Sequence, residues 1–308
     1  MSLESDAIVD RRRLKRRLSI WRLLAVVIGI ALVVYASGSF VNVDGLGRAH
    51  VARLSVEGVI VEDPRLDAAL EAVRNNDNAR ALLVHINSPG GSTYGGERLY
   101  QGLRRVAENK PVVAVIGTLG TSAGYMAAIA ADRVFAGESS LTGSIGVLMQ
   151  FAEFSELLET LGIRAEQLTS GPLKGEPSPV KPLSPLARVA TQSLIDQTHE
   201  WFVGLVATRR PFDLATARRL ANGQVFIGRG ALQADLIDAI GGEREARDWL
   251  ASEHDISTSL PSRGVSYLEP EAIVDRLVGK VTGKSFLTER LTLDGLVSVW
   301  HPDLPIVD

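Results

Sequence analysis

Ser122 is a candidate nucleophile for acyl transfer, because of its position in the sequence. It lies in residues 117–131, a stretch that opens with glycines and continues in small helix-forming residues. The apolar run before it, residues 111–116, favours a short buried strand. Ser122 is therefore predicted at a strand-to-helix turn, where backbone N–H groups of a helix N-terminus favour negative charge. A nucleophile beside donors for a developing oxyanion is the arrangement that acyl transfer requires.

The alternative is that Ser122 or Thr121 only caps a helix. A second glycine-rich stretch favours the chemical interpretation. The sequence NSPGG at residues 87–91 also follows an apolar run, residues 81–86. Adjacent glycines let a backbone approach a ligand closely and turn its N–H groups toward it. Two strand ends, each followed by such a turn, could supply one oxyanion donor each.

A serine nucleophile needs a general base, and histidine is the first candidate. His85 lies in an apolar strand pattern and is expected to face the core or the sheet. His199 lies on a long helix pattern and is expected to be half exposed. A Ser-His-Asp triad stays open, because such triads are recognised by geometry and not by sequence order. The histidines of the chain are His50, His85, His199, His254 and His301.

A lysine is the favoured base. It works only when neutral, so its pKa must be lowered by burial or by a nearby cation. Lys174 lies in the proline-rich residues 169–185, which could hold it in an apolar crevice, although a surface position is the ordinary fate of a lysine. Lys110 and Lys181 are alternatives. Lys110 precedes a strand at the end away from the site, and Lys181 lies further along the same loop.

The elements that must position these residues alternate between strand and helix. This alternation predicts an α/β fold with a largely parallel sheet, whose site lies at the carboxyl ends of the strands. Strands are predicted at residues 51–56, 81–86, 112–116, 133–136, 141–148 and 164–168. Helices are predicted at residues 63–75, 93–108, 151–161, 186–209, 213–220, 243–251 and 270–278, with another directly after Ser122.

The N-terminal region differs in charge from the rest of the chain. Residues 1–40 carry seven basic and three acidic residues, a net charge of +4, whereas the whole chain is −3. The basic block at residues 11–17 is followed by the apolar residues 18–40, long enough to cross a bilayer. A cleaved signal peptide is the alternative to an uncleaved anchor. The acidic remainder argues against a nucleic-acid partner, and the absence of cysteine excludes disulfides.

Five motifs in one order give the chain a resemblance to the signal peptide peptidase A family of membrane-bound serine proteases. The resemblance spans roughly residues 50–250. The motifs are NSPGG at 87–91, GTLGTSAGYMAA at 117–128, LTGSIGV at 141–147, SGPLKGEPSP at 170–179 and GRGALQADLIDAIGG at 228–242.

This resemblance implies a ClpP/crotonase-like fold of repeated β-β-α units with a Ser/Lys dyad. Ser122 would be the nucleophile and Lys174 the general base. Gly91 and Ala123 would donate backbone N–H groups to the oxyanion, and Ser144 would help to orient the lysine. Gly90, Gly143 and Ile145 would bind substrate, and no cofactor or metal is expected. Where the family usually has an aspartate just after the lysine, this chain has Gly175 and Glu176.

The resemblance also implies a task and an assembly. The short, single-repeat form works as a homo-oligomeric ring, in which the lysine could serve the serine of its own or of a neighbouring subunit. It cleaves leftover signal peptides, and other unfolded peptides, on the outer side of the inner membrane. The predicted divisions are a cytoplasmic tail at 1–17, an anchor in the membrane lipid at 18–40, a linker at 41–50, the protease domain at 51–253 and a C-terminal extension at 254–308.

Two other functions are compatible with these residues. A crotonase-like acyl-CoA enzyme uses the same paired N–H donors on a thioester, but an outward-facing domain would be separated from CoA. An inactive, membrane-tethered ring that binds peptides without cleaving them is the other. Intact Ser122 and Lys174 favour the protease, and a fluorophosphonate probe would label a proteolytic serine but neither alternative.

Overall fold

The chain divides into two compact units. The larger holds residues 49–268 and 278–308, and the smaller holds the remainder. Every predicted site residue belongs to the larger unit. The computed structural model describes residues 17, 20–26, 28, 47–267 and 297–299.

The smaller unit contains the segment predicted as a membrane anchor, residues 18–40. Residues 20–26 of it are helical and exposed. Within the described ranges, no helix combines the length and the apolar character that crossing a membrane would require. The rest of the anchor, and the helix predicted at residues 270–278, lie outside the described residues, so both stay predictions.

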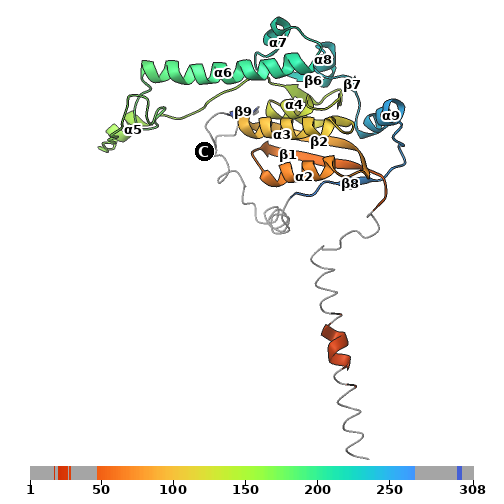
Figure 1. Cartoon of the computed structure of the whole chain (residues 1–308). Coiled ribbons are helices and arrows are strands. Elements are labelled where there is room, and N and C mark those ends of the chain that lie inside the picture. Colours follow the sequence, from red (N-terminus) through yellow and green to blue (C-terminus); the bar gives the residue numbers. More distant parts are fainter. Residues whose placement is uncertain (1–16, 18–19, 27, 29–46, 268–296, 300–308) are drawn as a thin grey trace, which may run out of the picture. The chain divides into compact units, whose positions relative to one another are not determined.

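The larger unit is built on one sheet in which parallel neighbours predominate, as the alternating sequence pattern predicts (Figure 1). Its main path runs β6-β5-β3-β2-β1-β8, with β4, β7 and β9 paired to its members. The two strands β8 and β9 come from the predicted C-terminal extension, so that extension contributes to the sheet. The strands are β1 His50–Ile60, β2 Ala79–Ser92, β3 Val112–Thr121, β4 Arg133–Ala136, β5 Leu141–Gly143, β6 Val225–Ile227, β7 Ala239–Ile240, β8 Ser262–Gly264 and β9 Val297–Val299.

Each long central strand has two parts with different neighbours. The first part of β2 pairs with β3 as far as Ile86, and after a shift in register Ser88 pairs with Gly120. The first part of β3 pairs with β4, whereas its last residues pair with β5. The predicted β-β-α units contain two strands before each helix. In the structure those two strands are the first and second parts of one long strand, β2 or β3. The glycine-rich stretches that were predicted as turns form the second part of each strand.

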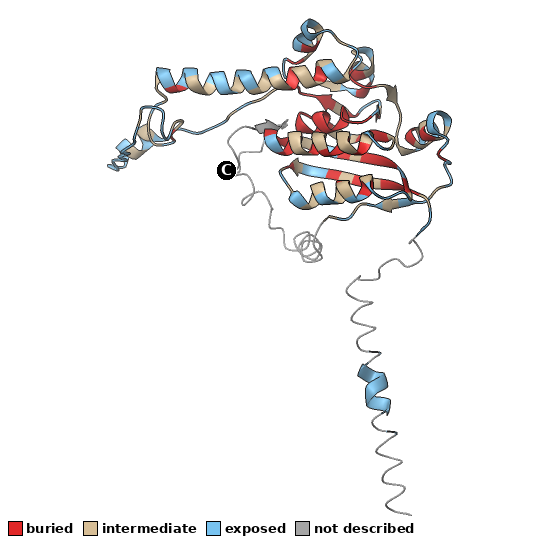
Figure 2. Cartoon of the chain, in the orientation of Figure 1, coloured by how far each residue is buried: buried red, intermediate tan, exposed pale blue. Residues whose placement is uncertain are grey.

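Helices cover both faces of the sheet, which explains why the central strands read as continuous apolar runs. Alternate residues such as Leu54 and Val84 pack against α2, α3 and α4 on one face. Leu83 and Val113 pack against α9 on the other. Figure 2 shows this buried centre in red. The helices are α2 Pro64–Arg74, α3 Thr93–Ala107, α4 Ala123–Ala128, α5 Ser155–Thr160, α6 Pro185–Arg209, α7 Leu214–Leu220, α8 Gly228–Gln233 and α9 Glu243–His254.

Several helices begin directly after a residue whose side chain caps them. Asp63 accepts a hydrogen bond from the N–H of Arg65 at the start of α2. Ser92 and Ser184 accept from backbone N–H groups at the starts of α3 and α6. These boundaries confirm the predicted helices to within one or two residues.

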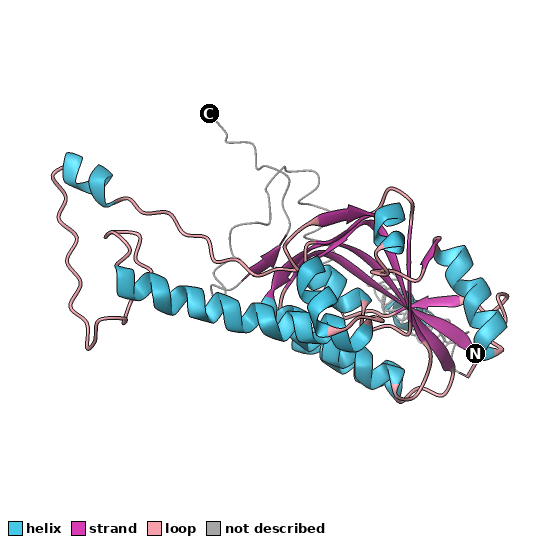
Figure 3. Ribbon diagram, turned by 90° about the horizontal axis from the view of Figure 1, so that it is seen from above, coloured by secondary structure: helices cyan, strands magenta, loops and turns pink. Residues whose placement is uncertain are grey.

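The segment between β5 and the middle of α6 extends away from the sheet (Figures 1 and 3). We call residues 149–195 the arm. No residue of α5 is buried, and the strand predicted at residues 164–168 is wrong, because this stretch is exposed loop without secondary structure. A strand needs a neighbour for its backbone groups, and among the described residues no strand pairs with this stretch. The helix predicted at 151–161 is also shorter than expected.

Candidate active site

Ser122 occupies a strained turn between β3 and α4. Its backbone has φ 58° and ψ −119°, close to the first central residue of a type II′ turn, a conformation dominated by glycine. The Ser122 N–H donates to the carbonyl of Gly143 at 2.8 Å, and the Ser122 carbonyl accepts from Met126 at 2.9 Å. Ser122 is the N-cap residue of α4 by position, but its side chain makes no capping bond, so the alternative of a serine that caps the helix with its hydroxyl is wrong. Strain of this kind is concentrated at functional sites.

The loop that carries the predicted oxyanion donor Gly91 lies directly beside this turn. The hydroxyl of Thr121 donates to the carbonyl of Pro89 at 3.1 Å. A Cβ added at Gly124 would lie 3.0 Å from the carbonyl oxygen of Ser88. The two glycine-rich stretches therefore meet, as their sequence positions predict. Ala123 begins α4, so its N–H has no acceptor within the helix.

Gly91 itself admits no side chain. A Cβ built there would lie 1.8 Å from the carbonyl oxygen of Ile60, its neighbour in β1. Gly90 has φ 111°, in the region that favours glycine, and its N–H donates to the Ser88 hydroxyl at 3.1 Å. Both glycines are thus required by the backbone that presents this loop to Ser122.

The third predicted stretch, around Ser144, also reaches the turn. Gly143 pairs with Thr121 across β3 and β5 and accepts the Ser122 N–H. Ser144 has φ 48°, its N–H donates to Gln224 at 2.7 Å, and it is 8% exposed. Ile145 is fully buried. Two backbone hydrogen bonds therefore hold Ser144 close to Ser122: the Ser122 N–H donates to the carbonyl of Gly143, and the Ser144 N–H donates to the carbonyl of Gln224.

Lys174 is not brought to Ser122 within one chain. It lies in the loop of the arm between α5 and α6, and it is exposed, so the predicted apolar crevice is wrong for the single chain. Arg209, at the C-terminal end of α6, donates to the carbonyl of Ile129 directly after α4. The 25 residues of α6 span about 37 Å at 1.5 Å each. The loop lies beyond the opposite end of α6 (Figures 1 and 3).

The other candidate bases make contacts elsewhere. His85 pairs with Ser55 and Val115 in the middle of the sheet. His199, half-buried as predicted, places Nε2 2.7 Å from the carbonyl of Ala221.

The two alternative lysines also have partners. Lys110 donates to the carbonyls of Val73 and Asn76. Burial lowers its pKa, but it lies at the amino end of β3, away from Ser122. Lys181 forms an ion pair with Glu176 at 2.7 Å.

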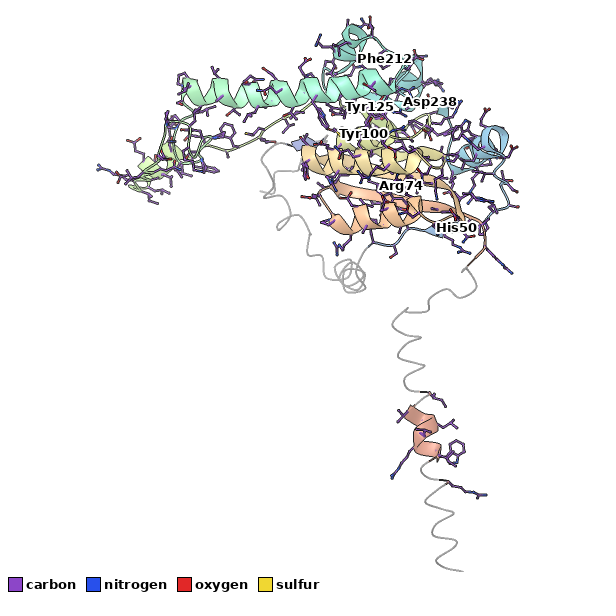
Figure 4. The ribbon with its side chains drawn as sticks, viewed as in Figure 1. His50, Arg74, Tyr100, Tyr125, Phe212 and Asp238 are labelled. Carbon is purple, nitrogen blue, oxygen red and sulfur yellow. The ribbon has the colours of Figure 1, made fainter. Side chains whose placement is uncertain are left out.

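Two residues support the turn although the sequence analysis did not select them. Tyr125 lies three residues after Ser122, and its hydroxyl donates to the carbonyl of Leu236 at 2.9 Å. Burial raises the pKa of Tyr125, and Figure 4 shows its side chain on α4 near Asp238. Thr142 donates to the carbonyl of Gly120 at 2.8 Å. The sequence did contain a signal for Tyr125, because it is a large residue with a polar hydroxyl in a run of mostly small residues.

Known proteins resemble this chain over the same region. The sequence matches the profile of Peptidase family S49 over residues 104–257. A Synechocystis sp. protein that is named as a protease is 34% identical over 207 residues, covering 67% of this chain and 74% of its own. Protease 4 of Haemophilus influenzae is 28% identical, covering 64% of this chain and 33% of its own. The chloroplastic serine protease SPPA of Arabidopsis thaliana is 29% identical, covering 68% and 30%.

Among solved structures, a mutant of ClpP1 from Listeria monocytogenes superposes with a TM-score of 0.43 at 14% identity. The match covers 63% of this chain and 92% of the ClpP1 chain.

Proposed function

The chain belongs to peptidase family S49 and is a serine peptidase, and we propose that Ser122 is its nucleophile and Lys174 its general base. The observation that carries this assignment is the strained turn at Ser122, with φ 58° and no capping bond from the side chain. It lies between the loop of Gly91 and the segment of Ser144, so a hydroxyl there has backbone donors close by.

The proposed reaction is acyl transfer to Ser122 followed by hydrolysis. Neutral Lys174 takes the proton of the Ser122 hydroxyl, whose oxygen attacks the carbonyl carbon of a peptide bond. The N–H groups of Gly91 and Ala123 donate to the oxyanion. The lysine ammonium then protonates the departing amine, and water cleaves the resulting ester. Gly90, Gly143 and Ile145, which are buried in the single chain, stay predicted substrate-binding residues.

The base is proposed to come from a neighbouring subunit of a ring. The support is that Lys174 is exposed in the loop beyond the end of α6 that is opposite to its contact with α4. The arm also exposes apolar side chains that a second copy would cover: Leu157, Leu161, Leu186, Val189 and Leu194 are 52–69% exposed. Contact with a neighbour would bury the lysine, and burial lowers the pKa of an amine.

The proposed substrates are leftover signal peptides and other unfolded peptides. The support is membership of the family and a basic N-terminal block followed by residues 18–40, which are long and apolar enough to hold the chain in the inner membrane. With the basic side in the cytoplasm, the peptidase unit lies outside it.

Mixing two inactive variants tests the dyad and its source. We expect Ser122→Ala and Lys174→Ala each to lose peptide cleavage, and the co-assembled mixture to regain about a quarter or more of the activity. Labelling of Ser122 by a fluorophosphonate should be lost in the first variant and slowed in the second. Wild-type cleavage by Lys174→Ala would refute the assignment of the base. Absence of labelling in the wild type would refute the nucleophile.

A further inference from the structure

A cavity lies at the amino ends of the central strands, at the end of the sheet opposite to Ser122. Its volume is about 520 Å³, within the range of about 300–1,000 Å³ that small-molecule sites occupy. His50, labelled in Figure 4, begins β1 at this end. β3 runs 10 residues from here to Ser122, which corresponds to about 33 Å at 3.3 Å each. The cavity is therefore separate from the candidate active site.

Two side chains of opposite charge line this cavity without pairing. Arg80 is the second residue of β2, and Asp255 follows the last residue of α9. No ion pair joins them, and among the described residues neither side chain has a hydrogen-bond partner. The guanidinium keeps its five N–H donors and the carboxylate its acceptor positions. A ligand that carries both an anion and a cation can therefore satisfy both groups at once.

Asp255 holds its charge at the unfavourable end of α9. The N–H groups of Asp255 and Ile256 both donate to the carbonyl of Leu250, which leaves the later carbonyls of the last turn without a donor from the helix. These carbonyls give the end of a helix a partial negative charge, which a cation stabilises and a carboxylate opposes. A cation bound beside Asp255 would be attracted by the carboxylate and by the helix end together.

Apolar side chains complete the part of the lining that matters here. Ile256 is buried, and Ala49, Pro111 and Leu260 are half-buried. Ile256 and Leu260 belong to the apolar cluster between the sheet and α9. The cavity thus offers apolar surface beside its two charges, which suits a ligand with an aliphatic side chain close to its charged ends.

We propose that this cavity binds a short apolar peptide or amino acid with both of its ends free. The ligand's carboxylate accepts from Arg80, its ammonium donates to Asp255 and to the end of α9, and its side chain lies against Ile256 and Leu260. Hydrolysis of one peptide bond creates one new ammonium and one new carboxylate, so this is the class of product that a peptidase releases. An ethanolamine phospholipid headgroup also joins an ammonium to an anion, and the test below separates the two sources.

The test is calorimetric titration of the full-length Ser122→Ala chain with L-leucyl-L-leucine. We expect a dissociation constant of about 0.1–1 mM, the range for a ligand of this size. Acetylating the amine or amidating the carboxylate removes one charged contact, so each blocked dipeptide should bind about tenfold more weakly or worse. Phosphoethanolamine, which represents the lipid headgroup, should also bind about tenfold more weakly or worse, because it has no aliphatic side chain to bury.

Two variants assign the ends of the ligand. Arg80→Gln should bind the free dipeptide about tenfold more weakly and no longer distinguish it from the amide. Asp255→Asn should weaken binding likewise and no longer distinguish the free dipeptide from the acetylated form. Arg80 is exposed, and asparagine tolerates the left-handed backbone of Asp255, φ 54°, so both variants should keep the urea midpoint of their parent. Arg188→Gln, which changes an exposed arginine of the arm, is the control and should bind as the parent does.

Three results would overturn the proposal. The first is no detectable binding of L-leucyl-L-leucine, or equal binding of the free and both blocked forms. The second is unchanged affinity in both variants, which would show that the dipeptide binds elsewhere. The third is binding of phosphoethanolamine alone, which would assign the cavity to lipid headgroups. Every titration uses a chain without the Ser122 hydroxyl, so the outcome does not depend on whether Ser122 is the nucleophile.

Discussion

Replacing Gly91 by alanine tests whether its N–H holds the oxyanion. The new Cβ would lie 1.8 Å from the carbonyl oxygen of Ile60 and 2.6 Å from the Ile60 nitrogen. Real Cβ contacts begin near 3.0 Å, so β1 and β2 must separate locally by about 1 Å. Gly91 is the thirteenth of the 14 residues of β2 and is paired on both edges, so that movement would carry its N–H out of position.

The expected effect is mainly on the chemical step. An oxyanion donor acts over 2.7–3.1 Å, and losing one lowers kcat by about 10²–10³. We expect Gly91→Ala to lose activity within this range, with a smaller change in KM. The assay is steady-state cleavage of a fluorogenic peptide, together with the second-order rate of fluorophosphonate labelling, which should fall in parallel.

Gly204→Ala is the matched control, because a Cβ at Gly204 in α6 meets nothing within 4 Å. It should leave kcat unchanged and raise stability by about 0.5–1 kcal/mol. Urea unfolding of both variants separates loss of folded protein from loss of catalysis. A folded Gly91→Ala protein with the wild-type kcat would refute the assignment of Gly91 as a donor.

Three further changes test the surroundings of the site. Tyr125→Phe leaves a buried carbonyl of the segment before β7 without its donor, so the free energy of unfolding should fall by about 1–3 kcal/mol in urea titrations; an unchanged midpoint would contradict this. Lys181→Met leaves the Glu176 carboxylate, which is 6% exposed, without the ammonium 2.7 Å away. Limited proteolysis of the loop before α6 should therefore accelerate, and it should slow again when Glu176→Gln is added. Equal rates of proteolysis in the wild type and in Lys181→Met would contradict a structural role of the Lys181–Glu176 ion pair. The N–H that precedes α9, with a neighbouring guanidinium, lowers the pKa of Glu245 from 4.5 to about 2. Because the pKa is lower in the folded state, this stabilisation is present above about pH 4.5 and lost as the pH falls toward 2, so the urea midpoint of the wild type should drop more steeply in this window than that of Glu245→Gln.

Local signals in the sequence were sufficient for most of the fold. Apolar runs and capping residues such as Asp63 and Ser92 placed the strands and helices of the sheet, because burial and caps are encoded nearby. The segment at residues 164–168 was predicted as a strand on the same grounds, and wrongly. A strand exists only where another strand can pair with it, and the sequence of one segment does not contain that information.

The candidate site was predictable in part for the same reason. The stretches around Gly91, Ser122 and Gly143 each end a strand, so a parallel sheet had to bring them together. The position of Lys174 could not be predicted, because it depends on how α6 directs the arm away from the sheet. The pairing of β9 was equally inaccessible, since no local pattern links residues 297–299 to Gly91.

The backbone of Ser122 has a consequence for how such a chain would evolve. A non-glycine residue held at φ 58° and ψ −119° costs about 1–3 kcal/mol, a sizeable share of the roughly 5–15 kcal/mol that keeps a domain folded. Ser122→Gly would remove that cost and the hydroxyl together. In a lineage in which peptide cleavage was no longer selected, we would therefore expect glycine to replace serine at this position, with loss of activity and a gain in thermal stability.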